Sequence, residues 1–245
     1  MTRPALLLLP GLLCDETVWA AQCADLAEIA DCRVPVYRTL ASIEAMAGHV
    51  LATAPSDTFA MAGHSMGGRV ALEVIRRAPE RVLRLALLDT GFQALAAGNA
   101  GAKERAGRYQ LLERVRAEGM RAMGEQWARA MVRPERIGDP VFEAILQMIA
   151  RNTPDMFESQ IRALLARPDA TALLPLIGCP VLLLCGARRT VEPAGAARGD
   201  AERHFRLAPG SYRNVGAYDD DGTARRGVAR AGRVADGAVR QHGGK

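Results

Sequence analysis

The chain has 245 residues, of which 49% are hydrophobic, and a chain of this length can bury one sizeable core as a single domain. Residues 1–187 contain 20 basic and 20 acidic side chains, so the whole net charge of +5 lies in residues 188–245. The excess of basic residues therefore gives no argument for a nucleic-acid partner. Five cysteines form no CxxC pair and no cluster with histidine, which favours a reduced, cytoplasmic protein over a disulfide-rich or metal-binding one.

The N-terminal residues MTRPALLLLPGLLCD superficially look like a secretory signal. However, the apolar run is short, Pro10-Gly11 interrupts it, and Leu13 stands where a small residue would precede a cleavage site. We therefore interpret this run as a strand of a cytoplasmic protein. No other segment approaches the length of a membrane helix, and we expect no membrane association.

Five short apolar runs predict β-strands, and most of them end in Gly, Ser or Asp. Several are apolar throughout, as in strands that are covered on both faces. Helical patterns intervene at residues 42–54 and 67–82. This order predicts an α/β fold with a mostly parallel sheet and helices on both faces. The five runs are ALLLLPG (5–11), CRVPVYR (32–38), TFAMAGHS (58–65), VLRLALLDTG (82–91) and CPVLLLCGA (179–187).

Between the fourth and fifth runs, from about Leu95 to Ile177, the hydrophobic period becomes helical and stays so. Its position in the chain favours a helical cap inserted over one end of the sheet, and ordinary helical packing is the alternative. Few aromatic residues occur in it, so we expect a modest apolar pocket. The predicted organisation is a core of residues 1–187, with this cap at about 95–177, followed by a basic Ala/Gly/Arg-rich tail of residues 188–245.

The most specific local pattern is Gly63-His64-Ser65-Met66-Gly67, which fits G-x-S-x-G and lies between an apolar run and an amphipathic helix. In that context the strand turns abruptly into the helix, which imposes strained backbone angles on Ser65 and leaves room only for glycine at Gly63 and Gly67. We predict Ser65 as a nucleophile. His64 is expected to point away from the attacking face and to act in packing or hydrogen bonding.

This pattern resembles the α/β-hydrolase superfamily, and the resemblance covers Leu6 to Ala187. In that family the backbone N–H after an early His-Gly or Pro-Gly helps to form the oxyanion hole. The resemblance therefore implies that Leu12 N–H, after Pro10-Gly11, and Met66 N–H hold the tetrahedral oxyanion. A plain turn at Pro10-Gly11 is the alternative. The implied activity is that of a serine esterase-like hydrolase acting on a small-molecule ester or similar acyl substrate, without cofactor or metal.

The family's catalytic acid and base are missing from their expected places. The acid follows the VLLLCGA strand, where this chain has Arg188 and Arg189, and the base lies in a later Gly-His turn, which this chain lacks. His204 and His242 are the only later histidines, and their contexts do not match. The resemblance therefore predicts a hydrolase whose activity is impaired in the sequence as written.

A shift of the reading frame by one nucleotide explains both losses. The codons then permit Asp in place of Arg188 and His in place of Ala217, the latter in a run like the family's GHMTTxE turn. We interpret residues 188–245 as frameshifted, through a sequencing error or a real lesion, and expect them to be poorly ordered and to leave the sheet incomplete. A genuine, diverged basic tail is the alternative.

Two other functions stay open. The chain could be a non-catalytic scaffold that binds acyl ligands, or an enzyme that uses Asp89, at the end of LALLDTG, as a relocated acid. Serine in the turn argues against the related dehalogenases, which use Asp there. The pattern fits esterases, thioesterases, lactonases and carbon–carbon hydrolases alike, and nothing in it indicates an oligomeric state.

Overall fold

A computed structural model describes residues 3–184, and the expectations for residues 188–245 lie outside this part of the chain. Within it, five strands form one sheet in the order β2-β1-β3-β4-β5, and all four pairings are parallel. The predicted α/β fold with a parallel sheet is therefore confirmed. The strands are β1 (Ala5–Leu9), β2 (Asp31–Arg33), β3 (Phe59–His64), β4 (Val82–Leu88) and β5 (Val181–Leu184).

The edge strand β2 is shorter than the apolar run that predicted it. It pairs with β1 over three residues and ends at Arg33, opposite Leu7. Pro35 has no N–H to donate to a ladder, and its ring restricts the backbone of Val34. The rest of the run leaves the sheet as a loop, although Tyr37 within it is buried.

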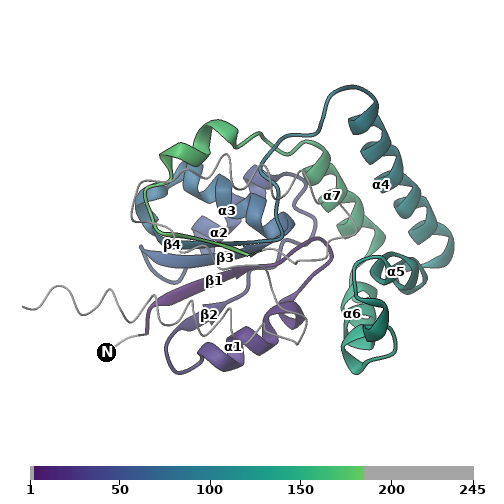
Figure 1. Ribbon diagram of the computed structural model, residues 1–245, viewed down its shortest axis with the longest axis horizontal. Coiled ribbons are helices and arrows are strands. Elements are labelled where there is room, and N and C mark those ends of the chain that lie inside the picture. The colour runs from purple at the N-terminus through teal and green to yellow at the C-terminus, as the bar shows by residue number, and fades with distance from the viewer. Residues whose placement is uncertain (1–2, 185–245) are drawn as a thin grey trace, which may run out of the picture.

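Helices cover both faces of the sheet (Figure 1). Helices α2 (Ile43–Thr53) and α3 (Met66–Arg77) lie on one face, and α1 (Ala20–Leu26) lies on the other. Ser42 begins α2, because its hydroxyl accepts a hydrogen bond from Ala45 N–H at 3.0 Å. The connections between parallel strands thus pass through helices, as parallel pairing requires.

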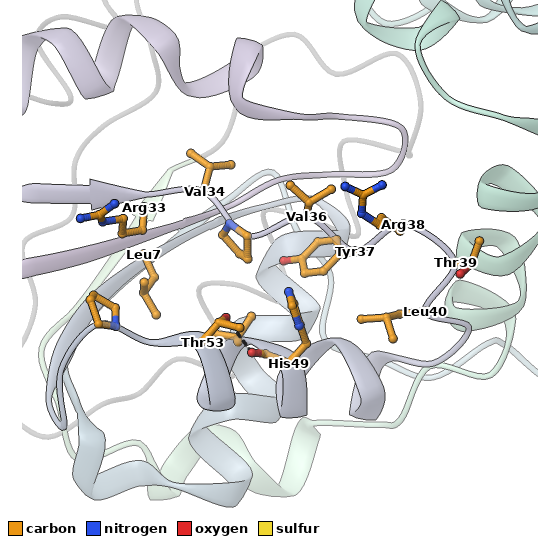
Figure 2. A pocket seen from close by; sticks show the side chains of 13 residues that line it. Leu7, Arg33, Val34, Val36, Tyr37, Arg38, Thr39, Leu40, His49 and Thr53 are labelled. Atoms are coloured by element: carbon orange, nitrogen blue, oxygen red, sulfur yellow. Dashed lines mark hydrogen bonds between the residues drawn. The ribbon is translucent and has the colours of Figure 1, made fainter.

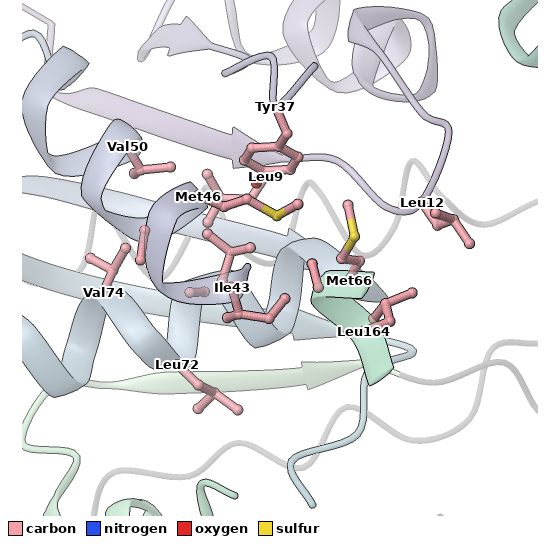
Figure 3. Close-up of a cluster of buried hydrophobic side chains, with 14 of the residues drawn as sticks. Leu9, Leu12, Tyr37, Ile43, Met46, Val50, Met66, Leu72, Val74 and Leu164 are labelled. Carbon is pink, nitrogen blue, oxygen red and sulfur yellow. The ribbon is translucent and has the colours of Figure 1, made fainter. Parts of the chain in front are cut away.

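The core under α2 and α3 consists mostly of aliphatic and methionine side chains, together with Tyr37 (Figure 3). Ile43, Met46 and Val50 recur on one side of α2 at helical spacing and meet Val74 of α3 and Leu9 of β1, and all five are almost fully buried. Each such side chain contributes about 1.5–3 kcal/mol through removal of apolar surface from water. This packing holds α2 and α3 against the sheet.

Between β4 and β5 the chain is helical through most of residues 95–177, as predicted. The helices gather at one end of the sheet, on the right of Figure 1. Two short 3-10 turns, Pro134–Arg136 and Thr171–Leu176, complete the segment. The helices are α4 (Gly98–Glu118), α5 (Met120–Arg129), α6 (Pro140–Ala150) and α7 (Pro154–Leu165).

A partly buried ion pair joins α4 to the residues after α7. The Arg167 guanidinium is buried and donates two hydrogen bonds to the Glu104 carboxylate, at 2.8 and 2.9 Å, and Arg108 donates two more, at 2.8 and 3.0 Å. Burial alone would raise the pKa of Glu104, but the hydrogen bonds from Arg167 and Arg108 outweigh burial and lower it to about 2.

We expect Glu104→Gln to lower the free energy of unfolding by about 2 kcal/mol at pH 7, because it leaves the Arg167 charge buried without its carboxylate. The folded pKa is below the unfolded value, so this stability is present above about pH 4.5 and is lost as the pH falls towards 2. Urea unfolding at pH 7 and pH 3 measures both effects. Glu113→Gln, at the exposed pair with Arg116, is the control and should cost under about 0.5 kcal/mol; equal losses in both variants would contradict the prediction.

Candidate active site

Ser65 occupies a sharp turn between strand and helix, at the place that the sequence predicts. β3 ends at His64, α3 begins at Met66, and Ser65 between them has φ 52° and ψ −115°. A residue with a side chain rarely adopts a positive φ, and such strain persists only where neighbours hold it. Here Ser65 N–H donates to Leu88 O at 2.9 Å, and Ser65 O accepts from Thr90 Oγ1 at 2.7 Å.

Three glycines permit this turn, because the backbones around it approach too closely for side chains. A Cβ on Gly63 would stand 2.6 Å from Gly67 O, and one on Gly67 would stand 2.1 Å from Leu9 O. The motif predicts the need for both glycines. It does not single out Gly68, where a Cβ would meet the Thr90 side chain at 2.6 Å. The start of α3 thus packs directly on β1 and β3.

The loop that follows β1, residues 11–15, lies beside the serine. A Cβ on Gly11 would stand 3.4 Å from Ser65 Cβ and 3.1 Å from His64 Nδ1. The proximity follows from the sheet, since β1 and β3 are neighbours and Leu9 pairs with Gly63. His64 is therefore placed against the β1 loop, and its predicted packing role stays a prediction.

The two predicted oxyanion donors belong to these adjoining segments. Leu12 follows Gly11 in the β1 loop, and Met66 is the first residue of α3, where the helix offers its N–H no acceptor. Among residues 3–184, neither amide donates a hydrogen bond. Both N–H groups are thus available to an external acceptor, and their catalytic role stays a prediction.

Asp89, the proposed relocated acid, follows β4 at the same edge of the sheet as Ser65. Its backbone has φ 45°, and its N–H donates to Leu184 O of β5 at 2.9 Å. The register explains the placement, because Leu88 of β4 lies opposite both His64 and Leu184. The catalytic role of Asp89 stays a prediction.

Cys14 also lies in the β1 loop. Its thiol contacts Leu12 O at 3.5 Å, and burial raises the pKa of the thiol to about 12. A neutral thiol is a poor nucleophile at physiological pH. The raised pKa therefore disfavours a nucleophilic role for Cys14.

His49 faces a different part of the molecule. It belongs to α2 and lines a cavity of about 740 Å³ with the chain that follows β2, its ring pointing towards Tyr37 (Figure 2). The lining contains neither Ser65 nor the β1 loop, so this cavity is not the predicted acyl pocket. The other lining residues are Leu7, Arg33, Val34, Pro35, Val36, Arg38, Thr39, Leu40, Val50, Thr53 and Pro55.

Three polar side chains of the helical segment bind the β1 loop. None of the three was identified from the sequence. Gln160 Oε1 of α7 accepts from Leu13 N–H at 2.9 Å, and Asn152 Nδ2, after α6, donates to Leu13 O at 3.1 Å. Arg151 donates to the Asp15 carboxylate at 2.7 Å. About 140 residues separate the partners, and no local pattern indicates such contacts.

The described part of the chain carries no grouping of three or more His, Cys, Asp or Glu side chains suited to a metal ion. Its helices also include none with the length and apolar character needed to cross a membrane.

Comparisons with known proteins agree with this geometry. Residues 28–188 match the family described as the alpha/beta hydrolase fold. A solved thermophilic esterase from Thermogutta terrifontis, with malate bound, is 28% identical with a TM-score of 0.66, over 82% of this chain and 78% of the esterase. No curated protein matches the sequence significantly.

Two further solved structures are also similar to this chain in fold. The enol-lactonase from Burkholderia xenovorans LB400 is 20% identical with a TM-score of 0.76, and the esterase from Exiguobacterium antarcticum is 16% identical with a TM-score of 0.71. Each similarity covers 98% of this chain and 93% of the other protein. At these identities the likeness shows the fold alone.

Proposed function

Because the chain belongs to the α/β-hydrolase superfamily, we propose that it is built as a serine hydrolase for small-molecule esters or similar acyl compounds. The observation that carries the proposal is Ser65 in a strained turn between β3 and α3, with φ 52°. That conformation costs stability, and strained backbone of this kind concentrates at functional sites. The esterase with 28% identity supports the same reaction class.

In the proposed mechanism, Ser65 Oγ attacks the acyl carbonyl and forms a tetrahedral intermediate. The N–H groups of Leu12 and Met66 donate hydrogen bonds to the developing oxyanion, and the N-terminus of α3 adds favourable electrostatic potential. In the frame-restored chain, a histidine base takes the Ser65 proton and gives it to the leaving group as the acyl carbon–leaving group bond breaks. The same histidine then activates a water molecule, which attacks the acyl-enzyme and releases the carboxylic acid and free Ser65. The chemistry requires no cofactor or metal.

The helices of residues 95–177 act in this proposal as a cap over the site. Support comes from the contacts of Gln160, Asn152 and Arg151 with the β1 loop, which adjoins Ser65. A cap anchored there would form the wall of the acyl pocket on the side of the β1 loop.

We propose a cytoplasmic location, since Cys14, Cys23, Cys32 and Cys179 are unpaired.

The sequence as written lacks the base and the acid, and we propose that its reading frame is shifted after Ala187. Support comes from two family-like motifs that emerge in a single alternative frame, one in place of Arg188 and one in place of Ala217. The nucleotide sequence tests this directly. The Arg188 codon must be CGA or AGA and must be followed by C; any other codon removes the restored acid.

A panel of p-nitrophenyl esters with graded acyl chains tests the function on the frame-restored protein, which carries Arg188→Asp and Ala217→His with the rest of the shifted tail. We expect a burst of one equivalent of nitrophenol with the short acyl chains, because the few aromatic residues in the cap suggest a modest pocket. Ester binding without a burst would favour the non-catalytic scaffold. A burst that Asp89→Asn abolishes would favour the relocated acid.

A further inference from the structure

We propose that Gln160 is a positioning residue for the oxyanion hole. In this proposal the Gln160 side chain fixes the β1 loop from α7, so that Leu12 N–H is directed at the reacting carbonyl oxygen before the substrate arrives. The inference rests on the proposed function and assigns a role to a helical segment that otherwise only covers the site.

Leu13 is the residue through which Gln160 acts. Leu13 is fully buried and has φ 60°, a left-handed conformation that costs a residue with a side chain about 1–2 kcal/mol. Its N–H donates to Gln160 Oε1 at 2.9 Å, and its carbonyl accepts from Asn152 Nδ2 at 3.1 Å. The Leu12–Leu13 peptide is therefore held on one side of Leu12, and Gly11 lies on the other beside Ser65.

The orientation of the Gln160 amide is itself determined by the structure. The side chain is only 3% exposed, and its Nε2 faces Arg38 O at 3.5 Å, which leaves Oε1 for Leu13. A buried amide costs free energy unless it is hydrogen-bonded, and an apolar residue would fill this place in α7 at lower cost. The bond to Leu13 accounts for a glutamine at this position.

The other two contacts are less suited to this role. Arg151 is half exposed, and its ion pair with Asp15 contributes little in water. Asn152 Nδ2 also donates to Met148 O at 3.0 Å, at the end of α6, so its loss would disturb that helix as well. Gln160 contacts the loop at Leu13, which is buried and strained. A small displacement of Leu13 would move Leu12, because the two residues share a peptide bond.

The test compares two Gln160 variants in the frame-restored protein. Gln160→Met keeps the length of the side chain and removes the acceptor, and we expect kcat for p-nitrophenyl acetate to fall about tenfold to a hundredfold with KM changed less than about twofold. Loss of an oxyanion donor costs about a hundredfold to a thousandfold, and loosening one should cost less. Gln147→Met, exposed on α6, is the matched control and should leave kcat unchanged.

Gln160→Glu provides the rescue. A protonated carboxyl accepts from Leu13 N–H and donates to Arg38 O, whereas the ionised form repels the Arg38 carbonyl. Burial raises the pKa of such a carboxyl. We therefore expect the kcat of Gln160→Glu to be close to that of the restored parent at pH 6. The ratio of the two kcat values should then fall as the pH rises. This profile also decides the proposal if Gln160→Met fails to fold.

A measurement without turnover separates this proposal from the proposed function. In the chain as written, Gln160→Met should speed hydrogen exchange in residues 11–15 at least about tenfold while β3 exchanges as before. Normal exchange and normal kcat in Gln160→Met, or a flat pH ratio in Gln160→Glu, would overturn the Gln160 proposal alone. Absence of Ser65-dependent turnover from the restored protein would overturn the proposed function, and the catalytic role of Gln160 with it.

Discussion

Restoring the reading frame after Ala187 is expected to raise kcat for p-nitrophenyl acetate about a millionfold. Removing the members of a serine triad together lowers kcat by about that factor, because the hydroxyl is a poor nucleophile until a base takes its proton. In the described structure, His49 lines the cavity beside α2, and His64 lies against Gly11. We expect neither to act as the base, and the restored Ala217→His supplies it.

The comparison uses the chain as written, the restored chain, and a third chain. The third chain has the restored tail but carries leucine instead of histidine at position 217 (Ala217→Leu). The chain as written should keep about a thousandfold to ten-thousandfold acceleration over water, because an oxyanion hole and binding remain without the triad. Ala217→Leu should return the restored chain to that level. A chain as written that turns over within tenfold of the restored chain would show that a base exists elsewhere, and the frameshift proposal would then lose its chemical support.

The fold could be predicted from the sequence because its signals are local. Each apolar run is long enough for one buried strand, and helical patterns between them require parallel crossovers. The error at β2 is local as well. The run of residues 32–38 has the hydrophobicity of a strand, but Pro35 stops the ladder at Arg33. A proline within a predicted strand should therefore have shortened that prediction.

The site could be predicted only in part, for the same reason. The positive φ of Ser65 follows from a five-residue motif, whereas that of Leu13 does not. Leu13 is held by Gln160 and Asn152, which lie 147 and 139 residues away in the sequence. The sequence around both residues indicates ordinary helical packing. Only the three-dimensional structure shows that Gln160 of α7 and Asn152, after α6, meet the β1 loop.

Ser65→Ala should lower kcat about a millionfold in the restored chain and by less than about threefold in the chain as written. The two losses differ because a serine without its base contributes little, so removing it from an incomplete triad removes almost nothing. This strong non-additivity is the expected signature of residues that act as one unit. Purified variants assayed with p-nitrophenyl acetate, in both backgrounds, give the four rates that the comparison needs.

The matched control is Ser56→Ala, an exposed serine whose hydroxyl donates to Thr58 O at 2.7 Å, and it should change kcat in neither background. Thermal unfolding should also distinguish a loss of stability from a loss of the nucleophile. Alanine tolerates φ 52° about as poorly as serine does, so the melting temperature of Ser65→Ala should stay close to that of its parent. Equal losses from Ser65→Ala in the two backgrounds would mean that Ser65 works independently of the restored histidine. The strained turn would then serve binding or packing, and the nucleophile would have to be sought elsewhere.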